Sequence, residues 1–344
     1  MNTIFFCQEV LEQSKKVKRM KLSTVYGFLR KDLQEIEGML TNVIGADHPV
    51  LNEASLQLLQ AGGKRIRPVF VLLSSRMNGS QKHEKAVKTV AVALELIHMA
   101  TLVHDDVVDD AALRRGKPTV KHLYGGRVAM YTGDYMLARA LEEITTVRVP
   151  KIHQALSKTL VNVVEGEIAQ IKDKYNTEQT VRDYLRRIKR KTALLIATSC
   201  KLGALAANMS HREANQMYRY GYNVGMSFQI IDDILDFTAS EKELGKPTAS
   251  DLIQGNMTLP IFYAMKDPVF KKVLQDVFQY PNQVNTATIQ PILQLLDETE
   301  AIEQAYQVSN AYLQKALQEL KSFPNSKAKK TLQMIAVSIG KRRS

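Results

Sequence analysis

Two aspartate clusters are the parts of this sequence best suited to chemistry. The first is the run HDDVVDD at 104–110, and the second is the run IDDILD at 231–236. Each follows an apolar stretch of helical periodicity, so each is expected at the C-terminal end of a helix. There Asp105 and Asp109 lie one turn apart on one face, where they repel each other and the negative end of the helix dipole. A divalent cation bound between them removes that cost.

Carboxylates at this spacing suit Mg²⁺, which takes one or two carboxylates, keeps several waters and completes its shell with phosphate oxygens. One such cluster alone fits a solvated acidic helix end equally well. Two clusters of the same spacing favour a different hypothesis, in which they face each other across a helical bundle and hold Mg²⁺ around a diphosphate. The candidate metal ligands are Asp105, Asp106, Asp109, Asp232, Asp233 and Asp236.

A glycine–cation segment, AGGKRIRP at 61–68, is a candidate phosphate-binding site. Lys64 and Arg67 lie three residues apart and share a helix face, and arginine makes forked contacts with phosphate. An ordinary basic loop is the alternative.

Arg114 and Arg115 follow the first acidic cluster, which suggests that metals and guanidinium groups share the charge of a substrate. Pairing with Asp109 and Asp110 is the alternative, and it accounts for one arginine more easily than for both.

The densest basic run is RRIKRK at 186–191, and the chain carries a formal net charge of +12. Nucleic acid, anionic lipid and small phosphorylated substrates all attract such a chain. No aromatic residues interleave with the basic run, and no nucleic-acid module is recognisable. Leu185 and Ile188 mark the inner face of a helix here, so we expect Arg186, Arg187, Lys189 and Arg190 to be mostly solvated.

Helical periodicity extends over almost the whole chain from Lys21 onward. Apolar residues recur at three- and four-residue spacing, as in the stripe of Leu51, Ala54, Leu58 and Ala61, whereas alternation with a period of two is rare. Glycine and proline mark the breaks, for example at 62–63 and 149–150. We therefore predict an all-α fold, a single large helical bundle over residues 21–344, preceded by a mobile leader at 1–20.

The cellular compartment is predicted from cysteine usage and hydropathy. Two distant cysteines, Cys7 and Cys200, form no disulfide framework in a chain of 344 residues, which favours a reducing compartment. No apolar run is expected to reach the eighteen or so residues of a membrane span. The first 20 residues place apolar before basic residues, the reverse of a secretory signal. We predict a cytoplasmic protein.

The chain resembles the trans-prenyl diphosphate synthase family from about Leu56 to Pro260. The segment GGKxxRP at 62–68, both aspartate motifs and Gly245-Lys246-Pro247 occur in the family's order. Within the family, the resemblance is strongest to the large catalytic component of bacterial heptaprenyl diphosphate synthases. One departure is Asn256, where the family often has lysine.

The resemblance implies a deep central cavity and a role for each motif residue. Gln229 stands three residues before Asp232, so helical spacing independently brings it to the same site. The implied catalytic residues are Asp105, Asp109, Asp232, Lys191 and Gln229. The implied ligands of isopentenyl diphosphate are Gly63, Lys64, Arg67, His98 and Arg115. The implied ligands of the allylic diphosphate are Arg114, Lys191, Thr192, Gln229 and Lys246.

The expected reaction is ionisation of an allylic diphosphate, followed by attack of the double bond of isopentenyl diphosphate. The growing tail is expected to pass along the helix before Asp105, where Ala100 and Thr101 carry no aromatic ring to block it. The floor is then nearer Ile97. One helical turn rises about 5.4 Å, close to one isoprene unit, which predicts all-trans products of roughly 30 to 40 carbons, with about 35 favoured by the resemblance. A quinone side chain is the expected use.

The predicted partners are the two substrates and another subunit, either a smaller regulatory chain or a second copy. No nucleic acid and no transmembrane span are expected.

Two other functions remain open from the residues. A metal-dependent phosphohydrolase would use the His104-Asp105 dipeptide, but it needs further histidine ligands. A catalytically silent subunit is disfavoured by the complete aspartate motifs.

Overall fold

The computed structural model describes residues 26–79, 83–114, 116–240 and 248–342; the predicted leader at 1–20 lies outside these ranges. The described part of the chain is helical apart from turns, loops and one two-stranded hairpin. The elements are η1 (Gly27–Leu29), α3 (Arg30–Val43), α4 (Pro49–Gln60), α5 (Ile66–Ser75), α6 (Glu84–Val108), β1 (Leu113–Arg114), β2 (Lys117–Pro118), α7 (Val120–Tyr124), α8 (Gly126–Thr145), α9 (Pro150–Asp173), α10 (Val181–Ile188), the π-helix η2 (Lys189–Ala193), α11 (Leu194–Ala206), α12 (His211–Thr238), α14 (Ser250–Ile253), α15 (Leu259–Ala264), α16 (Pro268–Phe278), η3 (Pro281–Gln283), α17 (Gln290–Asp297), α18 (Ala301–Glu319) and α19 (Lys327–Gly340).

Local sequence signals explain where several helices begin. Proline occupies the first turn of α4, α9, α15 and α16, where its missing N–H costs nothing. Thr180 with Asp183, and Ser210 with Glu213, form capping boxes that start α10 and α12. The predicted break at 62–63 falls between α4 and α5, the break at 149–150 coincides with the start of α9 at Pro150, and the all-α prediction is confirmed.

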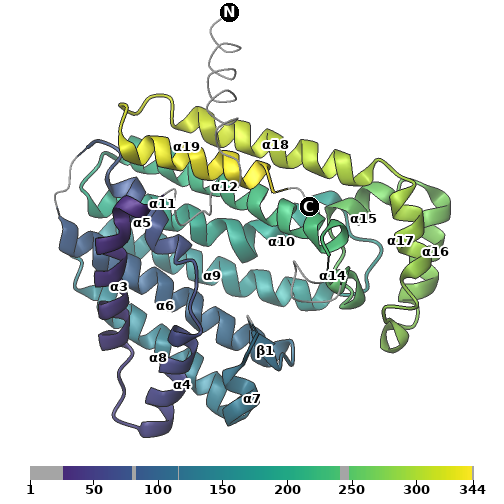
Figure 1. The fold of residues 1–344 in the computed structure, drawn as a ribbon, viewed down its shortest axis with the longest axis horizontal. Coiled ribbons are helices and arrows are strands. Elements are labelled where there is room, and N and C mark those ends of the chain that lie inside the picture. Colours follow the sequence, from purple (N-terminus) through teal and green to yellow (C-terminus); the bar gives the residue numbers. More distant parts are fainter. Residues whose placement is uncertain (1–25, 80–82, 115, 241–247, 343–344) are drawn as a thin grey trace, which may run out of the picture.

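Helix α11 is the central element of the bundle. Every residue of α11 except Lys201 is buried, as expected for a helix that is apolar on all sides. It packs against α5, α6, α9 and α12 (Figure 1). A Cβ atom on Gly203 would lie 2.3 Å from the Val71 carbonyl oxygen, so only glycine permits this approach of α11 to α5. The helices that carry the two aspartate motifs, α6 and α12, therefore flank one buried helix.

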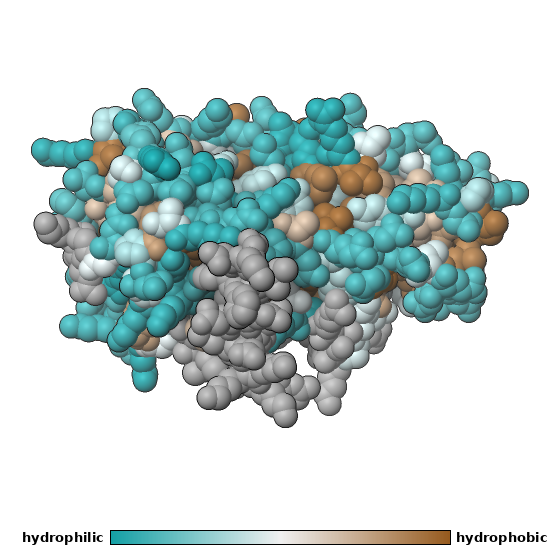
Figure 2. All heavy atoms as spheres, turned by 90° about the horizontal axis from the view of Figure 1, so that it is seen from above, coloured by the Kyte–Doolittle hydropathy of each residue, from teal (hydrophilic) through white to brown (hydrophobic). Residues whose placement is uncertain are grey.

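The outer helices are amphipathic. In α18 the buried residues recur at helical spacing, and α18 and α19 together cover α12 (Figure 1). Figure 2 shows that the face seen from the α18 and α19 side is largely hydrophilic, with hydrophobic side chains gathered in its right half. Apolar residues from Tyr26 to Ile339 form one hydrophobic core cluster.

The expectation that no apolar run reaches the length of a membrane span is wrong for α6. This helix, Glu84–Val108, is long and apolar enough to cross a membrane by composition, and 72% of its most apolar window is buried inside the fold. Its hydropathy is explained by packing, because α5, α8 and α11 surround it.

Candidate active site

The first aspartate cluster lies at the end of α6, as predicted. The helix ends at Val108, and Asp109 is its C-cap residue. Burial raises the pKa of Asp105 to about 6; the negative charges of Glu167 and Asp109 add to the shift, while Lys191 and Arg114 oppose it. Asp105 is thus a half-buried carboxylate whose charged form is disfavoured mainly by burial, a cost that a bound cation would offset.

The other aspartates of this cluster have partners of their own. Asp106 is buried, with 3% of its surface exposed, and accepts hydrogen bonds from the Arg114 guanidinium, at 2.8 Å from Nε. Asp110 is exposed and pairs with Lys121. Arg114 therefore pairs with Asp106 rather than with Asp109 or Asp110, the pairing considered from sequence. Of the three proposed ligands in the cluster, Asp106 is buried, Asp105 is half-buried and Asp109 is exposed.

A π-helical segment, Lys189–Ala193, presents Lys191 and Thr192 in two directions. The Lys191 ammonium donates to Gln170 Oε1 at 2.9 Å and lies 3.8 Å from a Glu167 carboxylate oxygen, both on α9. The Thr192 hydroxyl donates to Gln229 Oε1 on α12 at 2.7 Å. A π turn widens the helix by one residue and is frequent at functional sites. Here it lets consecutive residues reach α9 and α12.

The neighbouring backbones pack closely around this π turn. A Cβ atom on Gly225 of α12 would lie 2.6 Å from Ala193 Cα, and one on Gly166 of α9 would lie 2.6 Å from Arg190 Cβ. Glycine at both positions allows α9 and α12 to approach the wider turn. The glycines and the π turn thus act together to bring the polar side chains of three helices to one place.

The three aspartates of the second cluster, near the end of α12, have different surroundings. Asp233 is buried between the Tyr184 hydroxyl, at 2.7 Å, and the Gln229 amide, at 2.8 Å. Burial raises the pKa of Asp233 to about 7; repulsion from Asp251 and Asp232 adds to the shift, and the two hydrogen bonds oppose it. The Tyr184 and Gln229 side chains fix the Asp233 carboxylate in place.

Asp236 and Asp232 differ in their exposure and in the groups that they contact. Asp236 is 1% exposed, and its carboxylate accepts from the Ser250 hydroxyl and the Asp251 backbone N–H, each at 3.0 Å. It therefore holds the start of α14 against α12. Asp232 is the most open of the three, with 43% of its side chain exposed, and pairs with the Arg342 guanidinium at 2.9 Å. Arg342 follows the end of α19 by two residues, so the C-terminal end of the described chain contacts this cluster.

A series of neighbouring residues links the two acidic helix ends. Lys191 lies close enough to Asp105 to oppose the rise of its pKa, and the adjacent Thr192 bonds to Gln229, which bonds to Asp233. The two clusters, far apart in sequence, are therefore linked through residues of η2 and α12, and with α9 and α10 they form a candidate site. That the two clusters hold metal ions around a diphosphate stays a prediction.

The basic segment at 61–68 lies beside the same helix. Gly62, Arg65, His98 and Arg114 are among the residues that line a narrow pocket of about 10 Å³, which has room for at most about one water molecule. Lys64 and Gly63 are exposed, and Arg67 and His98 are half-buried. The pocket brings His98 and Arg114, predicted for different diphosphates, to one place. The predicted Arg115 and Lys246 lie outside the described residues.

The proposed tail-binding residues lie farther along α6, toward its N-terminus. Ala100 and Ile97 are buried, at 2% and 1% exposure, and Thr101 is half-buried with its hydroxyl donating to the His98 carbonyl at 2.8 Å. The role of these residues in binding the growing tail stays a prediction.

One expectation about the basic run at 186–191 is wrong. Arg187 is 7% exposed rather than solvated, and its guanidinium donates to Gln179 Oε1 at 2.8 Å and to the Met257 carbonyl. It also lies over the Tyr184 ring, 5.6 Å from the centroid. Arg187 thus fixes the segment before α15 against α10, a tertiary role that overrides the local pattern.

Sequence reasoning missed four residues of the site: Glu167, Gln170, Tyr184 and Arg342. The first two lie three residues apart on α9 and both contact Lys191. The charged and amide side chains in an otherwise apolar stretch, EGEIAQ at 165–170, were the available signal. Tyr184 gave none, because an aromatic residue at helical spacing is typical of a core.

The carboxylates of this candidate site would hold a divalent cation together with a bound substrate. Within the described ranges, no group of three or more His, Cys, Asp or Glu side chains could hold a metal ion by itself. Asp105 and Asp109 on one side and Asp232 on the other supply separate carboxylates. Mg²⁺ is bound in this way, by one or two carboxylates together with waters and phosphate oxygens.

Comparisons with known proteins give a consistent result. The polyprenyl synthetase family matches residues 48–296. The chain is 55% identical over 327 residues to heptaprenyl diphosphate synthase component 2 of Bacillus subtilis (strain 168), over 95% of this chain and 92% of that protein. A crystal structure of heptaprenyl diphosphate synthase from Staphylococcus aureus has a TM-score of 0.86 and 39% identity, over 95% and 100% of the two chains. A polyprenyl synthase from Caulobacter crescentus CB15, complexed with calcium and isoprenyl diphosphate, has a TM-score of 0.88 and 28% identity, over 95% and 99%.

Proposed function

The chain belongs to the polyprenyl synthetase family, and on that premise we propose that it is the catalytic subunit of a magnesium-dependent trans-prenyl diphosphate synthase. The reaction elongates an allylic diphosphate with isopentenyl diphosphate. The proposed product is an all-trans polyprenyl diphosphate of roughly 30 to 40 carbons, about 35 favoured, made in the cytoplasm for a quinone side chain.

One observation carries this proposal: two acidic helix ends meet around cationic and amide side chains. Asp105 and Asp109 on α6, with Asp232 on α12, would hold the metal ions. Lys191, Thr192 and Gln229 lie between these ends and would bind the allylic diphosphate. The relative from Caulobacter crescentus, solved with calcium and isoprenyl diphosphate, supports the same use of a divalent ion.

The residues would act by binding and orienting the two substrates. Magnesium, when bound, neutralises the allylic diphosphate and makes it a better leaving group. Lys191 and Arg114 would add positive charge where negative charge grows as the C–O bond breaks. The double bond of isopentenyl diphosphate then forms a bond to C1 of the allylic cation, and a proton leaves the adduct. The released diphosphate is the proposed proton acceptor.

The test is a substrate-dependence assay on the purified chain. We expect diphosphate release that requires an allylic diphosphate, isopentenyl diphosphate and Mg²⁺ together, and that EDTA abolishes. Radiolabelled isopentenyl diphosphate should enter an extractable lipid product in the same samples. Diphosphate release without isopentenyl diphosphate would favour a phosphohydrolase instead. The assay is run with the chain alone and with cell extract, because a second component is proposed.

An exposed apolar stripe on α9 supports the proposal that a second component binds this chain. Val161, Val164, Ile168 and Ile171 are 59%, 64%, 64% and 51% exposed. Their spacing of three, four and three residues is that of a helix that packs against another helix. The opposite side of α9 packs on α11 and the π turn. Because a relative is named as component 2 of its synthase, we propose that the other component covers this α9 stripe.

Charged substitutions in the α9 stripe should prevent this association. Val164→Glu with Ile168→Glu removes two apolar anchors and places two carboxylates at the centre of the contact, and we expect binding at least about 100-fold weaker. Sedimentation with and without the other component measures it. Val269→Glu is the control, because Val269 is 61% exposed on the distant α16. Self-assembly of wild type that the double variant loses would assign the stripe to a second copy, and unchanged assembly of the double variant would exclude the stripe.

A further inference from the structure

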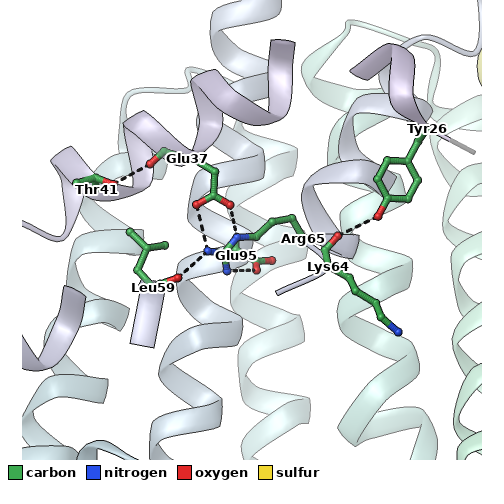
Figure 3. A network of polar contacts seen from close by, with 7 residues as sticks. All are labelled: Tyr26, Glu37, Thr41, Leu59, Lys64, Arg65 and Glu95. Carbon is green, nitrogen blue, oxygen red and sulfur yellow. Dashed lines mark hydrogen bonds and ion pairs between the residues drawn. The ribbon is translucent and has the colours of Figure 1, made fainter. Parts of the chain in front are cut away.

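Arg65 differs from the other cations of the segment at 61–68 because its side chain points into the protein. Its backbone is left-handed, with φ of 45°, at the N-cap of α5, and it is 8% exposed. The guanidinium pairs with Glu37 through Nε, and Nη2 lies 3.1 Å from the second Glu37 oxygen. Nη1 donates to Glu95 Oε1 at 3.2 Å, and Nη2 donates to the Leu59 carbonyl at 3.1 Å (Figure 3).

These contacts neutralise the positive charge of Arg65. Two carboxylates, from α3 and α6, face one guanidinium, so the group has no net positive charge to offer a phosphate. Burial by itself lowers the pKa of Arg65, but the hydrogen bonds and charges of Glu37 and Glu95 outweigh it and the pKa is raised. Among the residues that the structure describes, none is a hydrogen-bond partner of the second Glu95 oxygen. Without Arg65, a buried carboxylate would stand uncompensated at the pocket that His98 and Arg114 line.

The same contacts fix the backbone from which Lys64 and Arg67 project. The Lys64 carbonyl accepts from the Tyr26 hydroxyl at 3.3 Å, and the Lys64 side chain extends away from Arg65 (Figure 3). A residue with a Cβ is unfavourable in the left-handed conformation, so Arg65 needs its three partners to hold it there. Glu95 lies one turn before His98 on α6, which ties the basic segment to the helix that carries the first acidic cluster.

We propose that Arg65, held by Glu37 and Glu95, is a positioning residue that sets the direction of Lys64 and Arg67 at the isopentenyl diphosphate subsite. This inference rests on the proposed function. Arg65 itself does not contact the substrate. Its loss therefore weakens the binding of one substrate and leaves the chemical step and the other substrate in place.

Arg65→Lys tests the proposal, because lysine keeps the positive charge and loses the fork that reaches both carboxylates. We expect KM for isopentenyl diphosphate to rise roughly tenfold, with kcat and KM for the allylic diphosphate within about twofold of wild type. Arg219→Lys is the matched control. Arg219 makes a forked pair with Glu319, at 2.7 and 2.8 Å, on the outer surface of α12, and its replacement should leave all three constants unchanged.

Glu37→Gln is a second variant for the case in which Arg65→Lys does not fold. The Glu37 side chain is 42% exposed, so replacing its carboxylate weakens one of the two ion pairs of Arg65 at small cost to stability. KM for isopentenyl diphosphate should then rise about threefold. An unchanged KM in folded Arg65→Lys overturns the inference. Equal rises in both KM values also overturn it, since they indicate a general distortion. A wild-type chain without any activity dependent on isopentenyl diphosphate refutes the proposed function instead.

Discussion

Asp105→Asn is expected to lower kcat by about 10²–10³-fold or more while the protein stays folded, because one electrostatic contributor to the departure of diphosphate is removed. Asparagine keeps the shape of the side chain and removes its charge, so the metal loses a ligand. Relief of the repulsion among Asp105, Glu167 and Asp109, which helps to raise the pKa of Asp105 to about 6, should leave stability unchanged or slightly higher. Steady-state kinetics at saturating Mg²⁺ and a thermal unfolding curve measure the two effects.

Asp110→Asn is the control for this variant within the same acidic cluster. Asp110 has φ of 53°, a conformation that asparagine tolerates, and its exposed carboxylate pairs with Lys121 rather than with any group of the site. We expect kcat close to that of wild type. If Asp105→Asn were as active as Asp110→Asn, the acidic helix end would be a solvated cap, and the metal hypothesis would fail.

The features that sequence predicted well are those decided by local periodicity. Helical spacing placed the two aspartate clusters at the ends of α6 and α12, because the apolar residues that precede them repeat within a single helix. Helical spacing alone also predicted that Gln229, three residues before Asp232, lies at the same cluster. Glycine and proline marked the ends of α4 and the start of α9 for equally local reasons.

The directions of individual carboxylates depend on distant partners, so spacing does not predict them. Asp233 faces inward because Tyr184 comes from α10 to meet it, and Asp236 because α14 begins against it. Arg187 is buried for the same kind of reason, since a loop carbonyl some 70 positions away accepts its hydrogen bond. The π turn at Lys191 is a further case, because the register of hydrogen bonds there follows from packing against Gly225 and Gly166.

Ala100→Phe is expected to shorten the product from about 35 carbons to roughly 15–20. Ala100 lies five residues before Asp105 on α6, about 7.5 Å along the helix axis toward its N-terminus. A growing tail that passes along this helix would meet the new ring after one or two isoprene units beyond the reacting carbon. Turnover of the short allylic substrate should continue, because no diphosphate ligand changes. Chromatography of the dephosphorylated products measures chain length.

Two related variants separate a blocked tail from a disturbed core, since Ala100 is only 2% exposed and an added ring can strain its neighbours. Ala100→Ser adds almost no bulk and should give the wild-type product. Ala100→Leu adds an intermediate volume and should give products of intermediate length, with a thermal unfolding midpoint near that of wild type. A graded shortening across Ser, Leu and Phe follows only if the side chain at 100 borders the tail. A folded, active Ala100→Phe enzyme with an unshortened product would place the tail along another helix, most simply α8 or α11, which pack on α6.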